Sequence, residues 1–368
     1  RPARGRPVGY TRGANTASTT IASEARRTNV LRDVVEWGRR LGRNPTLMER
    51  AGTVNRRRAL VPPGGRAIPA LRRDNGPSRP RAPRVHATSR LAQGAIIPTM
   101  PSLSGRVAAI TGASAGIGAA CAERFAREGL AVSLAARRPD RLEQVCGRIV
   151  AAGGRALAVA ADVTSEADMR AFVTRTLATF GRLDVLVANA GIGFHGSLED
   201  TTPDVMRRLF DVNVMGTLHA VRAALPHFEA QRSGHVLVVS SIVGRRGVPG
   251  SAAYGATKFA QVGLAEALRA ELRGTGVHVS LVYPVGTITE FHAAMRENFG
   301  FGVEAVGPRQ TAGQVAEAML RCVRRPRPEV YPHTLSRLLA VLAVVAPGLC
   351  DRLVKRYARR RAAPVRAD

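Results

Sequence analysis

The sequence Thr-Gly-Ala-Ser-Ala-Gly-Ile-Gly occupies residues 111–118, directly after the aliphatic run of residues 107–110 and directly before a stretch with helical spacing. A glycine-rich turn between a strand and a helix is typical of dinucleotide binding. Gly112 permits the tight turn, Gly116 lets the backbone approach a pyrophosphate, and Gly118 lets the helix pack closely on the sheet. The helix N-terminus then offers amide donors to the phosphates. The residues of this turn that we expect to contact the cofactor are Gly112, Ser114, Gly116, Ile117 and Gly118.

Short aliphatic runs and longer amphipathic stretches alternate from Arg106 onward. Buried parallel strands read as unbroken aliphatic runs, and their alternation with helical stretches indicates repeated βαβ units. The expected strands are residues 107–110, 131–135, 156–160, 185–188, 236–239, 277–282 and 329–331. The expected helices are residues 117–128, 140–152, 165–180, 203–231, 252–273 and 310–324. The pattern predicts an α/β fold of the Rossmann type, with a doubly wound parallel sheet.

Composition divides the chain into three parts. Residues 1–99 contain 21 arginines, no lysine and five acidic residues, and so carry +16 of the total formal charge of +28. We expect this Arg- and Pro-rich segment to be disordered, and we favour the interpretation that it is upstream sequence before a start at Met100. A transit peptide, and a basic arm for nucleic acid or an anionic membrane, are the alternatives. Residues 100–332 should form one Rossmann domain and residues 333–368 a helical tail.

The tail contains the most apolar run of the chain, residues 338–346 (LLAVLAVVA), which Pro347 follows. It is far shorter than the roughly 18–20 apolar residues that span a bilayer. We expect a helix that docks on the domain surface or forms an oligomer contact. A helix lying on a membrane surface is the alternative, and would make the tail a peripheral membrane contact. We do not expect nucleic acid as a partner.

The cysteines Cys121, Cys146, Cys322 and Cys350 are widely separated and form no CxxC pair. This spacing indicates reduced thiols, with neither a disulfide framework nor a metal site, and therefore a cytoplasmic protein.

The segment Tyr254-Gly-Ala-Thr-Lys258 places a phenol and an ammonium on one face of a helix. A phenol is a poor base at neutral pH, but a neighbouring cation lowers its pKa. Lysine is otherwise almost absent, since only Lys258 and Lys355 occur among 55 basic residues. Ser241 follows the fifth expected strand and lies 13 residues before Tyr254, where its hydroxyl could hold a substrate oxygen. Ser240 is its nearest competitor.

We expect the residues that select between NAD(H) and NADP(H) at the end of the second strand, about 20 residues after the glycine-rich turn. An acid at this place selects a free ribose 2′-hydroxyl, whereas an arginine accommodates a 2′-phosphate. The chain has Arg137 and Arg138 here, with no carboxylate before Asp140, which favours NADP(H) over NAD(H). A solvated arginine pair is the alternative. Asp162 and Val163, which end the third strand, are expected beside the adenine.

Together these motifs resemble the single-domain form of the short-chain dehydrogenase/reductase family. The resemblance covers residues 102–332 and rests on TGxxxGIG at 111–118, Ala188-Asn189-Ala190-Gly191 as a variant of NNAG, Asn213, Ser241, and Tyr254-x-x-x-Lys258. It implies an oxidoreductase that interconverts an alcohol and a ketone or aldehyde by hydride transfer. The catalytic residues that it implies are Asn213, Ser241, Tyr254 and Lys258.

The resemblance also implies a role for each of these residues. Tyr254 exchanges a proton with the substrate oxygen, and Ser241 orients that oxygen. Lys258 lowers the pKa of Tyr254 and binds the cofactor ribose together with it. Asn213 helps to hold a water that links Lys258 to solvent.

Further cofactor contacts are implied at Asn189, Ala190 and Gly191, and at Pro284 and Thr289 of a segment similar to PGxxxT. Val285 replaces the first glycine of that segment, although Thr289 keeps its offset from Pro284. The family pattern also implies a homodimer or homotetramer that pairs through the helices expected at 203–231 and 252–273.

The substrate is expected to be apolar, because the segment 288–308 that should cover the pocket contains Phe291, Met295, Phe299 and Phe301. His195 and His292 are candidate substrate contacts, but we interpret both as solvated loop histidines. The alternative function is a non-catalytic scaffold or sensor that binds NADP(H). The intact set of asparagine, serine, tyrosine and lysine argues against it.

Overall fold

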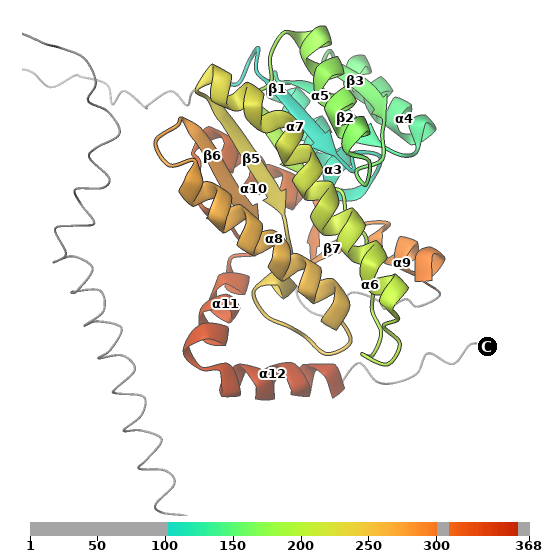
Figure 1. Ribbon diagram of the computed structural model, residues 1–368, viewed down its shortest axis with the longest axis vertical. Coiled ribbons are helices and arrows are strands. Elements are labelled where there is room, and N and C mark those ends of the chain that lie inside the picture. Colours follow the sequence, from blue (N-terminus) through green and yellow to red (C-terminus); the bar gives the residue numbers. More distant parts are fainter. Residues whose placement is uncertain (1–101, 300–308, 360–368) are drawn as a thin grey trace, which may run out of the picture. The chain divides into compact units, whose positions relative to one another are not determined.

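In the part of the chain that the computed structural model describes, residues 102–299 and 309–359, seven parallel strands form the central sheet (Figure 1). Its strand order is β3-β2-β1-β4-β5-β6-β9. The strands are β1 (Val107–Thr111), β2 (Ala131–Ala136), β3 (Arg155–Ala160), β4 (Val185–Ala188), β5 (Gly234–Val239), β6 (Val277–Val282) and β9 (Glu329–Val330). The strand order reverses between β1 and β4, which is where open parallel sheets bind ligands. The predicted Rossmann-type fold is confirmed.

Helices cover both faces of the sheet, because the central strands are buried on both sides. On one face α3 (Gly116–Arg127), α4 (Pro139–Ala151) and α10 (Ala312–Arg324) enclose a core that contains Phe125, Leu142 and Met319. On the other face α5 (Glu166–Phe180), α7 (Gly216–Gln231) and α8 (Ala252–Glu271) enclose Phe172, Phe228 and Val262. Tyr283, at the end of β6, joins the second core.

Local capping starts two helices where the sequence predicts. The Ser165 hydroxyl accepts from the amide of Asp168 at the start of α5. The Thr202 hydroxyl accepts from the amide of Val205 at the start of α6 (Pro203–Phe210), with Pro203 in the first turn. These bonds satisfy amides that lack a partner within the helix.

The helix expected at 203–231 has the predicted bounds but is not α-helical throughout. It consists of α6, a π-helical turn at Asp211–Met215, and α7, which follow one another without a break. A π-turn accommodates one extra residue and occurs often at functional sites. The turn here buries Asn213 completely.

The segment after β6 forms elements that the sequence analysis did not predict. A second sheet pairs β7 (Gly286–Ile288) with β8 (Arg309–Thr311) in parallel, so the helix expected from residue 310 begins at residue 312. Between them lies α9 (Phe291–Phe299).

Two helices follow β9, namely α11 (Leu335–Val345) and α12 (Pro347–Arg359) (Figure 1). No helix in the described ranges is long and apolar enough to cross a membrane. The expected disorder of residues 1–99 and the start at Met100 lie outside the described residues.

Gly118 should tolerate no larger side chain. A Cβ atom there would lie 2.8 Å from Asn189 Nδ2 and closer still to the carbonyl oxygen of Gly112. We expect Gly118→Ala to lower the free energy of unfolding by about 1–3 kcal/mol in urea denaturation, as overpacking does. The control is Gly147→Ala within α4, where nothing lies within 4 Å, and which should raise stability by about 0.5–1 kcal/mol. Equal effects of the two substitutions would show that this close approach is not a constraint.

Candidate active site

The four residues expected to be catalytic lie on three elements beside the carboxyl ends of the strands. Asn213 lies in the π-helical turn, Ser241 directly follows β5, and Tyr254 and Lys258 lie in the first turns of α8. Ser241 has extended backbone and starts a short 3-10 helix, where its Oγ accepts from the amide of Val243 at 3.4 Å. The fold therefore brings the three segments to one edge of the sheet.

Tyr254 lies beside Ser241. Burial raises the pKa of Tyr254, and the hydrogen bond with Ser241 lowers it in part. This differs from the expectation that Lys258 would lower that pKa, because desolvation disfavours the charged form of a buried phenol. At neutral pH the Tyr254 hydroxyl therefore carries its proton, the form required to donate it.

Lys258 is buried, with 3% of its surface exposed. Its Nζ donates to the carbonyl oxygen of Val239 at 3.1 Å and to Gln261 Oε1 at 2.9 Å, and lies 5.6 Å from the centroid of the Tyr254 ring. Burial lowers the pKa of Lys258 to about 7. The side chain can thus change its protonation state near neutral pH.

Gln261 joins Lys258 to Asn213, a role that the sequence analysis missed. While its Oε1 accepts from Lys258, its Nε2 donates to the carbonyl oxygen of Asn213 at 2.8 Å and to Thr217 Oγ1 at 2.7 Å. The Gln261 amide thus connects Lys258 to the backbone of Asn213. Its spacing of three residues from Lys258, which places both on one helix face, was the available signal.

The side chain of Asn213 holds the neighbouring backbone. Its Nδ2 donates to the carbonyl oxygen of Ile192 and to Thr257 Oγ1, both at 3.0 Å, and its Oδ1 accepts from the amide of Ile192 at 2.8 Å. Thr257 Oγ1 in turn donates to the carbonyl oxygen of Tyr254 at 2.7 Å. Asn213 therefore ties the segment after β4 to the first turn of α8.

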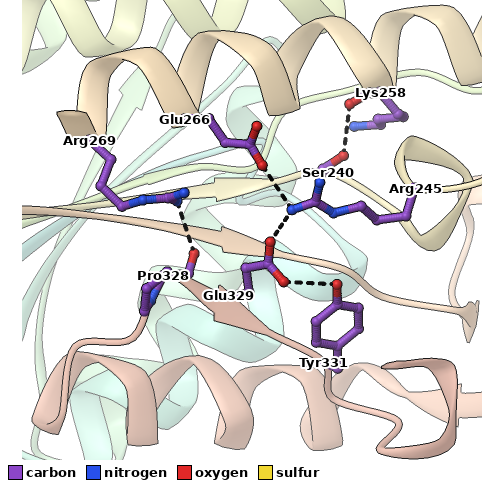
Figure 2. Close-up of polar contacts among 8 residues, drawn as sticks. All are labelled: Ser240, Arg245, Lys258, Glu266, Arg269, Pro328, Glu329 and Tyr331. Carbon is purple, nitrogen blue, oxygen red and sulfur yellow. Dashed lines mark hydrogen bonds and ion pairs between the residues drawn. The ribbon is translucent and has the colours of Figure 1, made fainter. Parts of the chain in front are cut away.

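A polar cluster fastens the segment that follows Ser241 (Figure 2). Arg245 donates to Glu266 on α8 at 2.9 Å and to Glu329 on β9. Its guanidinium lies 4.9 Å from the centroid of the Tyr283 ring, a cation–π contact. The Tyr331 hydroxyl donates to Glu329 at 2.9 Å (Figure 2). The cluster connects this segment to α8 and to the edge of the sheet.

Ser240, the nearest competitor of Ser241, is buried and already engaged. Its Oγ donates to the carbonyl oxygen of Lys258 at 3.0 Å (Figure 2). Ser240 thus fastens α8 to the end of β5.

The start of α3 fits a bound pyrophosphate. Its N-cap residue, Ala115, makes no side-chain capping bond, and its first turn contains no acid, so the first amides have no side-chain partner. Gly116 has φ +57°, and a Cβ atom there would lie 3.2 Å from Thr289. Helix N-termini of this kind bind phosphate groups. Thr289 therefore lies beside the glycine-rich turn.

The other expected cofactor residues from the β4 side adjoin this turn. Asn189 Nδ2 donates to the carbonyl oxygens of Thr111 and Gly112, at 3.0 and 3.2 Å. A Cβ atom on Gly112 would lie 2.7 Å from Ala190 Cα. A Cβ atom on Gly191 would lie 3.1 Å from Asn213 Oδ1 and 3.6 Å from Lys258 Nζ, so Gly191 borders the catalytic group.

Arg138 reaches the glycine-rich turn, where its Nη2 donates to Ser114 Oγ at 3.3 Å. The same nitrogen lies 3.8 Å from a carboxylate oxygen of Glu290, which also accepts from Arg141 at 3.3 Å. Arg137 is exposed. Of the two predicted arginines, Arg138 is the one that lies beside the turn.

Asp162 and Val163 make local contacts. Asp162 Oδ1 accepts from the amide and hydroxyl of Thr164, both at 2.9 Å. The side chain of Val163 packs against Gly216 at the start of α7. Pro284 connects to the serine segment, since its carbonyl oxygen accepts from the amide of Ile242 at 3.0 Å.

The apolar side chains of α9 pack against the domain, and one of them contacts Tyr254. The rings of Phe291 and Tyr254 have centroids 5.9 Å apart, and Met295 is buried. Phe299 packs edge-on against Phe194, with centroids 5.4 Å apart. Phe301 lies outside the described residues.

Neither candidate histidine is a simple solvated loop residue. His195 is half-buried, and its Nδ1 lies 3.3 Å from the hydroxyl of Ser251, at the start of α8. His292 lies on α9, edge-on to Phe291 with ring centroids 5.9 Å apart. His195 therefore contacts the start of α8, and His292 contacts the ring of Phe291.

The burial of Lys258 should make stability depend on pH. Its pKa is about 7 in the folded chain against an ordinary value of 10.5, so between these values the unfolded chain binds more protons and stability rises with pH. Lys258→Met removes this contribution. We therefore expect the free energy of unfolding of Lys258→Met to exceed that of the wild type most near pH 6, and the difference to shrink towards pH 9. Urea denaturation across that pH range measures it. Lys355→Met, at an exposed position, should show no such trend, and parallel curves for all three proteins would contradict the burial of a titrating lysine.

Known proteins match this chain in sequence and in fold. The family model of the short chain dehydrogenases matches residues 106–299. An uncharacterised oxidoreductase of Listeria innocua is 38% identical over 191 residues, which are 51% of this chain and 77% of that protein. A crystal structure of a short chain dehydrogenase/reductase from Burkholderia phymatum in complex with NAD is 27% identical, with a TM-score of 0.63, and the match covers 73% of this chain and 100% of the other. A metagenomic short-chain oxidoreductase in complex with NADP is 36% identical, with a TM-score of 0.54 and coverage of 63% and 98%.

Proposed function

The chain belongs to the short-chain dehydrogenase family of oxidoreductases, and we propose that it interconverts an apolar alcohol with its ketone or aldehyde, with NADP(H) as the preferred cofactor. One observation carries the proposal. Tyr254, which keeps its proton at neutral pH, lies beside Ser241 and the buried lysine Lys258, and the ring of Phe291 on α9 packs against it.

The residues of the glycine-rich turn fit a nicotinamide dinucleotide, and solved relatives are bound to NAD or NADP. The amides that start α3 would hold the pyrophosphate, and Arg138 with Ser114 would hold a 2′-phosphate. Gly191 would border the nicotinamide end, because it adjoins Lys258, and Thr289 would lie beside the pyrophosphate, because it adjoins Gly116. When bound, the nicotinamide accepts or supplies the hydride.

Residues of the chain carry out the proton transfer. Tyr254 donates its proton to the carbonyl oxygen during reduction, and removes it from the alcohol during oxidation. Ser241 holds that oxygen in place through its hydroxyl. An ammonium on Lys258 stabilises the phenolate that proton donation leaves behind, and Gln261 and Asn213 hold the lysine in position.

Two further parts of the proposal concern assembly and location. Phe259 and Leu264 are large apolar residues exposed on α8, which supports pairing of this helix with a second copy to form a homodimer or homotetramer. The four cysteines are free thiols, which supports a cytoplasmic location.

Tyr254→Phe tests the catalytic assignment. The substitution removes only the hydroxyl, so we expect turnover to fall by about 10²- to 10⁴-fold, the contribution of a general acid, while the fold is retained. Turnover is measured by NADPH oxidation with a panel of apolar ketones and aldehydes, and cofactor binding by NADPH fluorescence. Lys258→Arg should not restore the activity of Lys258→Ala, because a planar guanidinium cannot replace a compact ammonium. Retained turnover in Tyr254→Phe would favour the alternative function, a cofactor-binding scaffold.

Arg138→Ala tests the cofactor preference. We expect the wild type to use NADPH at least about tenfold more efficiently than NADH, and Arg138→Ala to remove most of this difference, because a hydrogen bond to a charged group contributes about 1.5–3 kcal/mol. The measurement is kcat/KM for each cofactor. Arg141→Ala is the matched control, since Arg141 pairs with the same Glu290 and no hydrogen bond joins it to Ser114. A wild type that prefers NADH would refute the preference and leave the reaction type intact.

A further inference from the structure

Helix α11 exposes its large apolar residues and buries its small ones. The buried residues of α11 are Ser336 and Ala340. Five aliphatic side chains of the helix are between 54% and 81% exposed, and these are Leu335, Leu338, Val341, Val344 and Val345. An ordinary surface helix has the opposite arrangement. A contiguous apolar surface of this kind indicates an interaction site.

Helix α12 continues the apolar surface. Leu349 and Leu353 are each about half exposed and lie four residues apart, on one face. Cys350 is fully buried, and Asp351 accepts a hydrogen bond from Arg246. The α11–α12 pair is therefore fixed to the segment that follows Ser241, on the side of the sheet where the active site lies (Figure 1).

The described charged residues of α11 and α12 are mostly basic. No acid occurs in the sequence between Glu329 and Asp351. Asp351 is paired with Arg246, whereas Arg337, Arg352 and Lys355 are exposed. Basic residues beside an apolar face are typical of helices that lie in the interface of an anionic membrane.

We propose that α11 and α12 form a docking surface for an anionic lipid bilayer. The exposed aliphatic side chains enter the boundary of the acyl chains, and the basic residues contact the phosphate headgroups. A second copy of the chain fits the same surface less well, because a two-fold contact would bring two sets of basic side chains together.

Docking would present the active site to the membrane. Asp351 pairs with Arg246, five residues after Ser241, and the apolar ring of Phe291 packs against Tyr254. The preferred substrate would then be a carbonyl compound dissolved in the bilayer. This second step rests on the proposed function, whereas the docking itself does not.

Vesicle flotation of the full chain tests the docking. We expect the wild type to float with vesicles that contain phosphatidylglycerol in phosphatidylcholine, and not with pure phosphatidylcholine. Leu338→Glu combined with Val345→Glu should lower the partition coefficient at least tenfold, and so should Arg352→Glu combined with Lys355→Glu. Val150→Glu, at a 57% exposed position on α4, is the matched control and should bind as the wild type does.

The basic segment 1–99 is present in the wild type and in every variant, so a difference in flotation between them does not come from this segment. Equal flotation of the wild type and Leu338→Glu/Val345→Glu would assign binding to that segment and overturn the proposal. Absence of flotation would also overturn it. So would a dimer in sedimentation that the same two substitutions dissociate without any effect on vesicle binding.

A tryptophan reporter locates the contact. Trp37 is the only tryptophan of the chain, so Trp37→Phe combined with Val344→Trp gives emission from α11 alone. We expect a blue shift with anionic vesicles, and quenching by brominated lipids. Emission that stays unchanged while the protein floats would overturn the assignment to α11.

A separate activity measurement tests the inference that the substrate is dissolved in the bilayer. Leu338→Glu/Val345→Glu should keep its turnover of a water-soluble carbonyl compound and lose at least fivefold on one dissolved in anionic vesicles. Equal losses on both substrates would overturn the step. Failure of the proposed function would appear separately, as unchanged turnover in Tyr254→Phe, and would leave the flotation result valid.

Discussion

The glycine-rich turn, the start of α3 and the segment after β4 approach so closely that no Cβ atom fits between them. Gly112 faces the backbone of Ala190, and Gly118 faces both Gly112 and the side chain of Asn189. Asn189 holds the junction by donating to the carbonyl oxygens of Thr111 and Gly112. Because the strand order reverses here, this contact fixes the direction in which α3 presents its uncapped amides. The cofactor-facing half of the site depends on it.

The other half depends on a buried ammonium. An isolated charge in the interior is costly, and Lys258 is accommodated by one backbone carbonyl and one amide oxygen. The acceptors come from the end of β5 and from α8, while Gln261 extends the contact to the π-helical turn. The three elements that carry the catalytic residues are thus connected through one polar network.

Most of the fold could be predicted from the sequence, since buried parallel strands are aliphatic and the helices between them keep their spacing. The π-helical turn within residues 203–231 could not be predicted, because one extra residue leaves amphipathic helical spacing on both sides of it. The motif residues Ser241, Tyr254 and Lys258 could be identified from their order and spacing. Gln261 and Arg245 could not, because their partners lie on other elements and depend on how these pack. The pKa of Tyr254 was expected to fall because the sequence shows the neighbouring Lys258. The sequence does not show that Tyr254 is buried, and burial raises this pKa.

The distribution of lysines has a practical consequence. Of the two lysines in the chain, Lys355 is exposed and Lys258 is enclosed beneath the active site. Amine-directed reagents should therefore modify the lysine of α12 rapidly in the native protein, and the lysine of α8 only when that helix opens. The slow second modification, followed by mass spectrometry, would record the local opening of the catalytic centre without any engineered probe.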